Sequence, residues 1–104
     1  MLTKRFTLYI GLNDAEAKKQ IISTDAAYKM IASVFIEKIG GGTITEAEGI
    51  YTHEDGTVVH ENTIRVEAFA CEKDDIVWIC DYLKKALNQE SIAVVTQEIE
   101  SEFM

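Results

Sequence analysis

The chain has 104 residues, of which 47% are hydrophobic and 27% charged, an ordinary balance for one globular domain. Its formal net charge is -8, and the acidic excess lies in the second half: residues 1–52 hold six basic and six acidic side chains, and residues 53–104 hold four and twelve. A negative charge of this size repels phosphate backbones and anionic lipid, which argues against nucleic acid and membrane surfaces as partners and favours a simple role in solubility.

The cysteines and the N-terminal segment indicate where the protein works. Cys71 and Cys80 have neither the spacing of metal ligands nor the density of a secreted disulfide scaffold, so we expect two buried thiols. Near the N-terminus, Phe6, Leu8 and Ile10 alternate with other residues, which is typical of a strand and not of an export signal. No stretch approaches the roughly 20 apolar residues of a membrane span. The sequence therefore predicts a cytoplasmic protein.

The first half of the chain predicts a strand, a loop and a helix. Residues 6–12 form the strand, with Phe6, Leu8 and Ile10 toward the core, and the polar segment 15–23 follows as a loop. Thr24 is expected to cap a helix that runs to about Lys38. Three glycines at 40–42 then end this helix with a left-handed cap. The apolar positions of the helix recur at helical spacing: Ala27, Met30, Ile31, Val34 and Phe35.

Residues 43–69 predict one long antiparallel hairpin, because two strand-like runs flank Asp55-Gly56. This dipeptide suits a tight type I′ turn of two residues. Paired positions then keep a constant sum, so Glu46 would face Arg65. One face of the hairpin would be small and mostly apolar, and the other mostly charged. The first is expected to carry Thr45, Ala47, Gly49, Asn62, Ile64, Val66 and Ala68, and the second Ile44, Glu46, Glu48, Ile50, Glu61, Thr63, Arg65 and Glu67.

A second helix and a last strand complete the chain. The charged segment 72–75 can cap the first turn of the helix, Asn88 is its expected C-cap, and residues 92–99 form the strand. Trp78 and Tyr82 lie one turn apart and off the apolar stripe, so we expect them to shield an edge of the core, with a contact in an oligomer as the second interpretation. The stripe itself consists of Ile76, Ile79, Cys80, Leu83, Ala86 and Leu87.

The resulting order, β-α-β-β-α-β, predicts a single ferredoxin-like α+β domain that spans residues 1–104. Right-handed crossovers place both helices on one face of a four-stranded antiparallel sheet. The small apolar face of the hairpin would meet the helices, and the charged face would be left open.

Several segments of the chain resemble a family of small bacterial proteins that is classed only as a domain of unknown function. They are TITEAEGIY at 43–51, ENT at 61–63, NQESI at 88–92 and LYIG at 8–11. Where that family tends to have Phe-Pro-Gly before the second strand, this chain has three glycines and no proline anywhere. The resemblance implies the fold and no particular reaction.

More remotely, the long central hairpin resembles that of the nitrogen-regulatory PII-like and divalent-ion-tolerance proteins. That resemblance implies a trimer that binds ligands between its subunits.

The expected open face gathers carboxylates around one arginine. The candidate binding or interface residues are Tyr9, Glu46, Glu48, Glu61 and Arg65. This group is either a solvated face with one weak cross-strand ion pair, a shallow polar pocket, or an interface in which a second sheet covers the carboxylates.

Other constellations do not form a site in the sequence. His53 and His60 would share one face of the hairpin, but two imidazoles are too few for zinc, so no metal is expected. The three glycines follow a helix, whereas phosphate-binding loops precede one. Neither cysteine has the setting of a nucleophile, and no Ser-His or Cys-His pair can be placed, so we expect no catalytic residues and no cofactor.

Three kinds of function remain compatible with the sequence. The first is a homo-oligomeric module that binds a small molecule or regulates another protein. The second is a small enzyme that uses the carboxylates of the open face, and the third is an acidic adaptor between proteins. Self-association is expected in particular, because a monomer would leave one face of the sheet and an edge strand uncovered.

Overall fold

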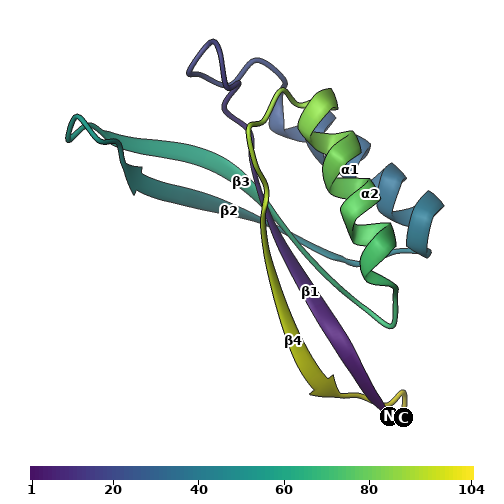
Figure 1. Ribbon diagram of the computed structural model, residues 1–104. Coiled ribbons are helices and arrows are strands. Elements are labelled where there is room, and N and C mark those ends of the chain that lie inside the picture. Colours follow the sequence, from purple (N-terminus) through teal and green to yellow (C-terminus); the bar gives the residue numbers. More distant parts are fainter.

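The computed structural model describes residues 1–104 and has the expected ferredoxin-like arrangement (Figure 1). Four antiparallel strands form one sheet in the order β2-β3-β1-β4. Both helices lie on the same side of this sheet, and the two termini meet at one end of it (Figure 1). The elements are β1 (Leu2–Gly11), α1 (Thr24–Ile39), β2 (Thr43–Thr52), β3 (Val58–Phe69), α2 (Lys73–Ala86) and β4 (Ala93–Glu100).

The hydrophobic core lies between the sheet and the helices. Phe6, Leu8 and Ile10 point into it, as the alternation of β1 predicts, and each is at most 1% exposed. Strand β1 begins at Leu2, earlier than expected, because its first residues pair with the last residues of β4, Leu2 with Glu100 and Thr3 with Ile99. The same core cluster contains Ile64 and Val66 of the neighbouring strand β3, together with Ile31 and Phe35 of α1 and Ile79 and Leu83 of α2.

The ends of α1 show why the helix begins and stops where it does. Ser23, one residue before the expected cap, accepts a hydrogen bond at its Oγ from the N–H of Ala26 at 3.1 Å. At the other end, Gly40 has a φ of 89° and donates its N–H to the carbonyl of Ile36. The expected left-handed glycine cap is therefore confirmed.

The hairpin has a different register from the one that the sequence predicts. Ala47 pairs with Thr63 and Glu46 with Ile64, so the predicted pairing of Glu46 with Arg65 is wrong by one position. The connection contains three residues, Glu54 to Gly56, and the N–H of Gly56 donates to the carbonyl of His53 at 2.9 Å. A three-residue connection of this kind places a type I turn before a left-handed residue, here Gly56 with a φ of 87°.

The shift by one residue turns the whole of β2 over, because side chains alternate between the two faces of a strand. Thr45, Ala47 and Gly49 therefore lie on the open face of the sheet, where carboxylates were expected. Glu46 and Glu48 lie on the face that carries the helices. The faces predicted for β3 are correct, since Ile64 and Val66 are buried under the helices and Arg65 and Glu67 are on the other side.

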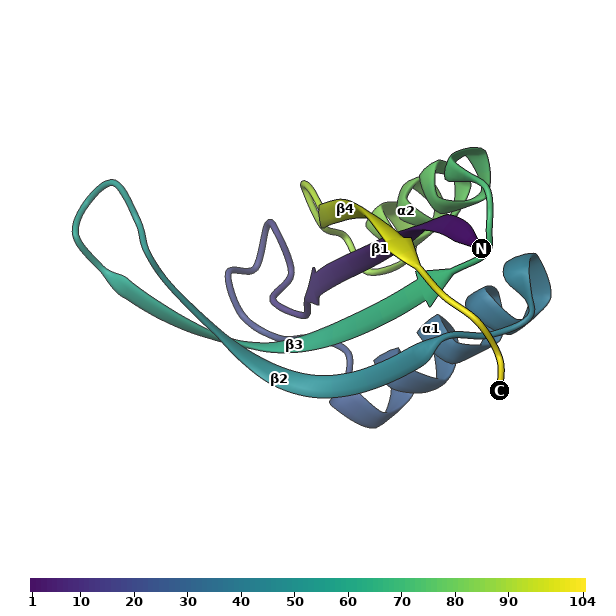
Figure 2. The same cartoon turned by 90° about the horizontal axis from the view of Figure 1, so that it is seen from below.

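Strands β2 and β3 continue beyond the helices as a projecting arm (Figure 2). The molecule is consequently elongated, with extents of 46 × 26 × 23 Å. Ile50, Tyr51 and Val58 on this arm are 62%, 42% and 55% exposed. Neither helix is long and apolar enough to cross a membrane.

Candidate functional site

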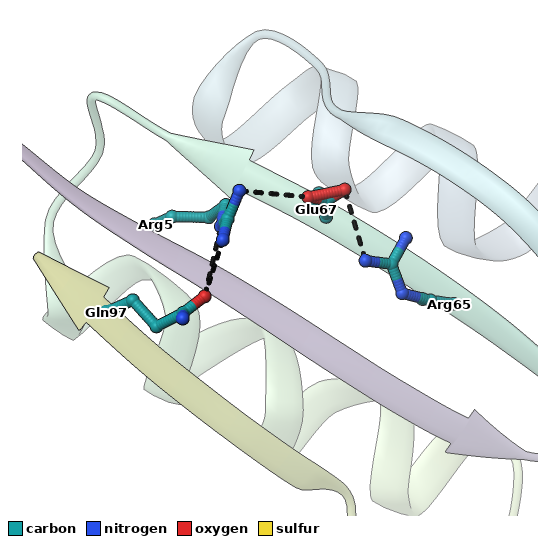
Figure 3. A network of polar contacts seen from close by, with 4 residues as sticks. All are labelled: Arg5, Arg65, Glu67 and Gln97. Atoms are coloured by element: carbon teal, nitrogen blue, oxygen red, sulfur yellow. Dashed lines mark hydrogen bonds and ion pairs between the residues drawn. The ribbon is translucent and has the colours of Figure 1, made fainter. Parts of the chain in front are cut away.

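A polar network occupies the middle of the open face (Figure 3). Glu67 forms ion pairs with Arg65 at 3.2 Å and with Arg5 at 3.7 Å, and Arg5 donates a hydrogen bond to the side-chain oxygen of Gln97 at 2.6 Å. The ion-pair partner of Arg65 is thus its neighbour along the same face of β3, and not Glu46. These four side chains join β1, β3 and β4 across the face that no helix covers.

Tyr9 connects this network to the end of β1. The guanidinium of Arg65 lies 6.0 Å from the centre of the Tyr9 ring, and the two residues are directly paired across β1 and β3. The pKa of Arg65 lies above its ordinary value, first because of the interaction with the Tyr9 side chain and also because of the charge of Glu67. Arg65 therefore remains a fixed positive charge beside Tyr9.

A hollow of about 390 Å³ lies next to Tyr9, where the open face meets the projecting arm. Its walls come from the end of β1, the loop at 13–18, the arm of the hairpin and the turn that precedes β4. Tyr9, Tyr51 and His53 contribute rings to the lining, and Glu61 and Glu90 contribute carboxylates. The volume falls within the roughly 300–1,000 Å³ of small-molecule sites.

Glu61 is held in place at the edge of the hollow. Its Oε2 accepts a hydrogen bond from the N–H of Asn13 at 2.8 Å, whereas Oε1 has no hydrogen-bond partner within the chain. The carboxylate lies directly against the backbone of Gly11, on the neighbouring strand. Glu61 is half-buried and lines the hollow, so its free oxygen is available to a ligand.

The electrostatic character of the hollow is acidic. Desolvation raises the pKa of Tyr51, and the nearby charges of Glu61 and Glu90 raise it further. Asp14 adds a third carboxylate to the lining, and Lys18 is its only lysine or arginine. The arrangement therefore favours a ligand that carries positive charge and a flat ring.

The loop at 13–18 is fastened on both sides. Within the loop, Asp14 Oδ1 accepts from the N–H groups of Glu16 and Ala17, and its Oδ2 accepts from the side chain of Asn88 at 3.0 Å. Gln89 donates to the carbonyl of Asn13. The hydrogen bond from the N–H of Ala17 is the main reason why the pKa of Asp14 lies below its ordinary value, and the hydrogen bond from Asn88 is the next. The segment after α2 thus holds one wall of the hollow in place.

The structure brings together three of the five predicted site residues. Tyr9 and Glu61 line the hollow, and Arg65 lies beside it in the network of the open face. Glu46 and Glu48 lie on the opposite face of the sheet, so they take no part in this group.

Some lining residues were not expected from the sequence, among them Gly11, Lys18, Tyr51 and Glu90. Gly11, at the end of a strand, was a signal that could have been used, because such a glycine often marks close approach of another group.

The histidines were predicted to share a face, and this prediction is wrong for the same reason as the register. His60 pairs with Ile50, and its Nδ1 lies 2.9 Å from Glu48 Oε1 on the helix side. His53 packs edge-on against Tyr51 at the hollow. No group of three or more His, Cys, Asp or Glu side chains is placed to hold a metal ion.

The remaining candidates lie away from the hollow. Trp78 and Tyr82 stack with ring centres 5.6 Å apart on the outside of α2, and the Lys38 ammonium lies 4.4 Å from the centre of the Trp78 ring. Cys71 and Cys80 are free and half-buried against the core, less buried than expected. Desolvation raises the pKa of both thiols, which makes them poor nucleophiles.

No family model and no curated protein matches the chain. Solved structures with the same fold do exist. A phage SAM lyase in complex with S-methyl-5′-thioadenosine superposes with a TM-score of 0.67 at 20% sequence identity, covering 92% of this chain and 81% of that one. The apo state of a phage SAM lyase also has a TM-score of 0.67.

Solved structures of CutA and of the divalent ion tolerance protein CutA1 are also similar. CutA from Synechococcus elongatus has a TM-score of 0.60 at 10% identity over 92% of this chain and 75% of that one. CutA1 from Ehrlichia chaffeensis has a TM-score of 0.58 at 13% identity over 95% and 84%. These similarities show the fold, and they confirm the predicted likeness to the PII-like group at that level.

Proposed function

We propose that this protein binds a small, positively charged nucleoside in the hollow around Glu61 and that it does so as a homo-oligomer in the cytoplasm. The observation that carries the proposal is the free Oε1 of Glu61 in a hollow that is both acidic and lined by aromatic rings. A half-buried carboxylate stabilises a cation more strongly than a solvated one, since the local dielectric constant is lower.

S-adenosylmethionine (SAM) has the chemistry that the lining would recognise. Its purine can stack on Tyr9 or Tyr51, and its sulfonium and ammonium groups carry the charge that Glu61 and Glu90 favour. Its carboxylate would suit Lys18. The fold is that of a phage SAM lyase whose structure contains S-methyl-5′-thioadenosine, which supports a sulfonium nucleoside over other cations.

Self-association has its own support. The open face carries the network of Arg5, Glu67 and Arg65 and has no covering layer, and strands β2 and β4 are free edges of the sheet. The projecting arm exposes apolar side chains on both of its faces, Ile50 on one and Tyr51 on the other. The resemblance to the divalent-ion-tolerance proteins implies a trimer, in which a neighbouring copy would cover these surfaces.

Cleavage of the sulfonium nucleoside is the second candidate function. The unpartnered oxygen of Glu61 favours it, because a carboxylate in this position could accept a proton or stabilise a transient positive charge. An acidic hollow stabilises the charged sulfonium in the ground state, however, and the positive charge on sulfur declines as a carbon–sulfur bond breaks. Such stabilisation slows cleavage, so binding without turnover is the primary proposal.

Isothermal titration of the protein with SAM and with S-methyl-5′-thioadenosine tests the proposal. We expect SAM to bind more tightly, since only SAM carries the positive charge, and Glu61→Gln to reduce that preference. Glu46→Gln is the matched control, because Glu46 is on the opposite face of the sheet. Absence of heat and of a thermal shift with millimolar SAM would contradict the proposal, and chromatographic detection of S-methyl-5′-thioadenosine after incubation with SAM would favour cleavage.

A further inference from the structure

We propose that Gly11 is a positioning residue for Glu61, and that the space left by its missing side chain directs the carboxylate of Glu61 toward the ligand. This inference rests on the proposed function for the identity of the ligand. The claim about the position of Glu61 can be tested without any ligand.

Space, and not backbone conformation, is the reason for a glycine at position 11. The residue belongs to β1 and pairs with Thr63 in the regular ladder, and the glycines with positive φ are Gly40, Gly41 and Gly56. A Cβ at Gly11 would lie 2.5 Å from Cδ and 2.6 Å from Oε2 of Glu61, and closer still to Oε1. All three atoms of the carboxylate would be displaced, so rotation about the last bond of Glu61 could not relieve the overlap.

The carboxylate is also held from its other side. Beyond Gly11, the N–H of Asn13 donates to Oε2, and the carbonyl of Asn13 accepts from Gln89 in the turn before β4. The Leu12 N–H donates to the carbonyl of Asn62 at 3.0 Å and extends the pairing of strands β1 and β3 by one residue. Glu61 is therefore clamped between the backbone of Gly11 and the peptide of Asn13.

Because Glu61 is already held in one position, it loses less side-chain entropy when a ligand binds. A glutamate loses side-chain entropy when it is ordered, and here the fold has ordered it before the ligand arrives. Only one oxygen is used by Asn13, which leaves Oε1 without a hydrogen-bond partner in a residue that lines the hollow. Preorganised charge of this kind gives selectivity for a cation over a neutral analogue.

A double-mutant cycle between Gly11→Ala and Glu61→Ala tests the inference. We expect Gly11→Ala to lower the affinity for SAM about tenfold or more and to come close to the effect of Glu61→Ala. It should have no further effect in a protein that already lacks the Glu61 side chain. Gly42→Ala is the matched control, because the Cβ added at Gly42 would meet Glu67 O at 3.1 Å and Val66 Cγ1 at 3.3 Å, and not the carboxylate of Glu61. We expect this control to keep the wild-type affinity within about threefold.

The NMR signal of the Asn13 backbone amide reports on its hydrogen bond to Glu61, which distinguishes displacement of the carboxylate from a general loss of stability. In ¹⁵N-correlated spectra, its signal should shift in the same direction in Gly11→Ala and in Glu61→Ala, and it should stay unchanged in Gly42→Ala. Wild-type position of this signal and wild-type affinity in Gly11→Ala would overturn the inference.

Two further outcomes are also decisive. A Gly11→Ala protein that does not fold, together with a double variant that does, would support the overlap with Glu61, whereas failure of both to fold would overturn it. If the wild type does not bind SAM, the proposed function fails, and the Asn13 signal together with the melting temperatures of the cycle still decides the role of Gly11.

Discussion

Gly56 donates its N–H to the carbonyl of His53 at 2.9 Å and closes the turn of the projecting arm with a φ of 87°. The side chain of Asp55 supports the same turn, since its Oδ1 accepts from the N–H of Thr57 at 2.9 Å. This geometry determines the register of the entire hairpin and hence which residues of β2 face the hollow.

Replacement of Gly56 by valine should therefore destabilise the protein. A β-branched residue at positive φ is strained by about 1–3 kcal/mol, and no contact within 4 Å of the new Cβ would compensate for it. Denaturant unfolding measures the change. Gly56→Asn is the control, since asparagine tolerates the left-handed region and should cost less. Equal unfolding midpoints for valine and glycine would contradict the turn.

The network of the open face leads to a prediction about assembly. If a second copy covers Arg5, Arg65 and Glu67, then Arg65→Ala leaves a desolvated carboxylate with one weaker partner, which costs about 3–5 kcal/mol in a buried site and about 0–1 kcal/mol in an exposed one. We expect light scattering at micromolar concentration to give a mass above 11.7 kDa for the wild type and a lower mass for Arg65→Ala.

The control for this prediction is Lys29→Ala. Lys29 forms an exposed pair with Asp25 at 3.1 Å on α1, away from the sheet, so its loss should leave the mass unchanged. A wild-type mass of 11.7 kDa, or the same mass for Arg65→Ala at all concentrations, would argue against an oligomer built on this face.

The sequence was sufficient for the parts of the fold that burial determines. Alternation places Phe6 and Leu8 of β1 correctly, because only one face of the strand is covered. The number of residues in the turn could not be predicted, since Asp55-Gly56 occurs both in two-residue type I′ turns and in three-residue turns that end in a left-handed glycine. Both conformations give Gly56 a positive φ. They differ by one position in register, which decides on which face Glu46 lies.

The candidate site could be predicted only where it is made of strands. Glu61 was assigned to the open face by alternation, and the structure agrees. Lys18 and Glu90 come from irregular segments, and tertiary hydrogen bonds such as the one between Asn88 and Asp14 place those segments. No local pattern encodes such contacts, so these residues could not be placed from the sequence.

The wall formed by the loop at 13–18 should weaken at low pH. The pKa of Asp14 in the folded protein lies below its ordinary value, so the unfolded loop binds the proton more readily than the folded one. The contribution of Asp14 is complete above about pH 4 and is lost as the pH falls through its folded pKa. We expect the amide of Ala17, which donates to Asp14 Oδ1 at 2.8 Å, to lose protection against exchange in that range, relative to the intrinsic exchange rate at the same pH.

Asp14→Asn separates this effect from general acid unfolding. The variant has no charge at position 14, so the protection of the Ala17 amide against exchange should depend less on pH below 4, whereas Asp25→Asn on α1 should behave as the wild type does. An Ala17 amide with the same pH dependence in all three proteins would count against the role of Asp14.

The last prediction concerns the one lysine of the hollow. SAM carries a carboxylate that S-methyl-5′-thioadenosine lacks, and Lys18 lines the hollow with a left-handed backbone φ of 59°. If Lys18 contacts that carboxylate, Lys18→Met should weaken the binding of SAM about fivefold, as expected for roughly 1 kcal/mol from an exposed charge pair. The affinity for S-methyl-5′-thioadenosine should not change. Lys19→Met is a close control, because Lys19 is adjacent in the chain but does not line the hollow.

The salt dependence of SAM binding to the wild type and to Lys18→Met distinguishes an ion pair from other effects of the substitution. Screening at 0.5 M salt weakens an exposed ion pair, so the difference between wild type and Lys18→Met should shrink as salt is added. Equal losses of affinity for SAM and for S-methyl-5′-thioadenosine in Lys18→Met would mean that Lys18 shapes the wall of the hollow and does not recognise a carboxylate. Equal effects of Lys18→Met and Lys19→Met would instead point to the net charge of the protein, which both substitutions change by the same amount.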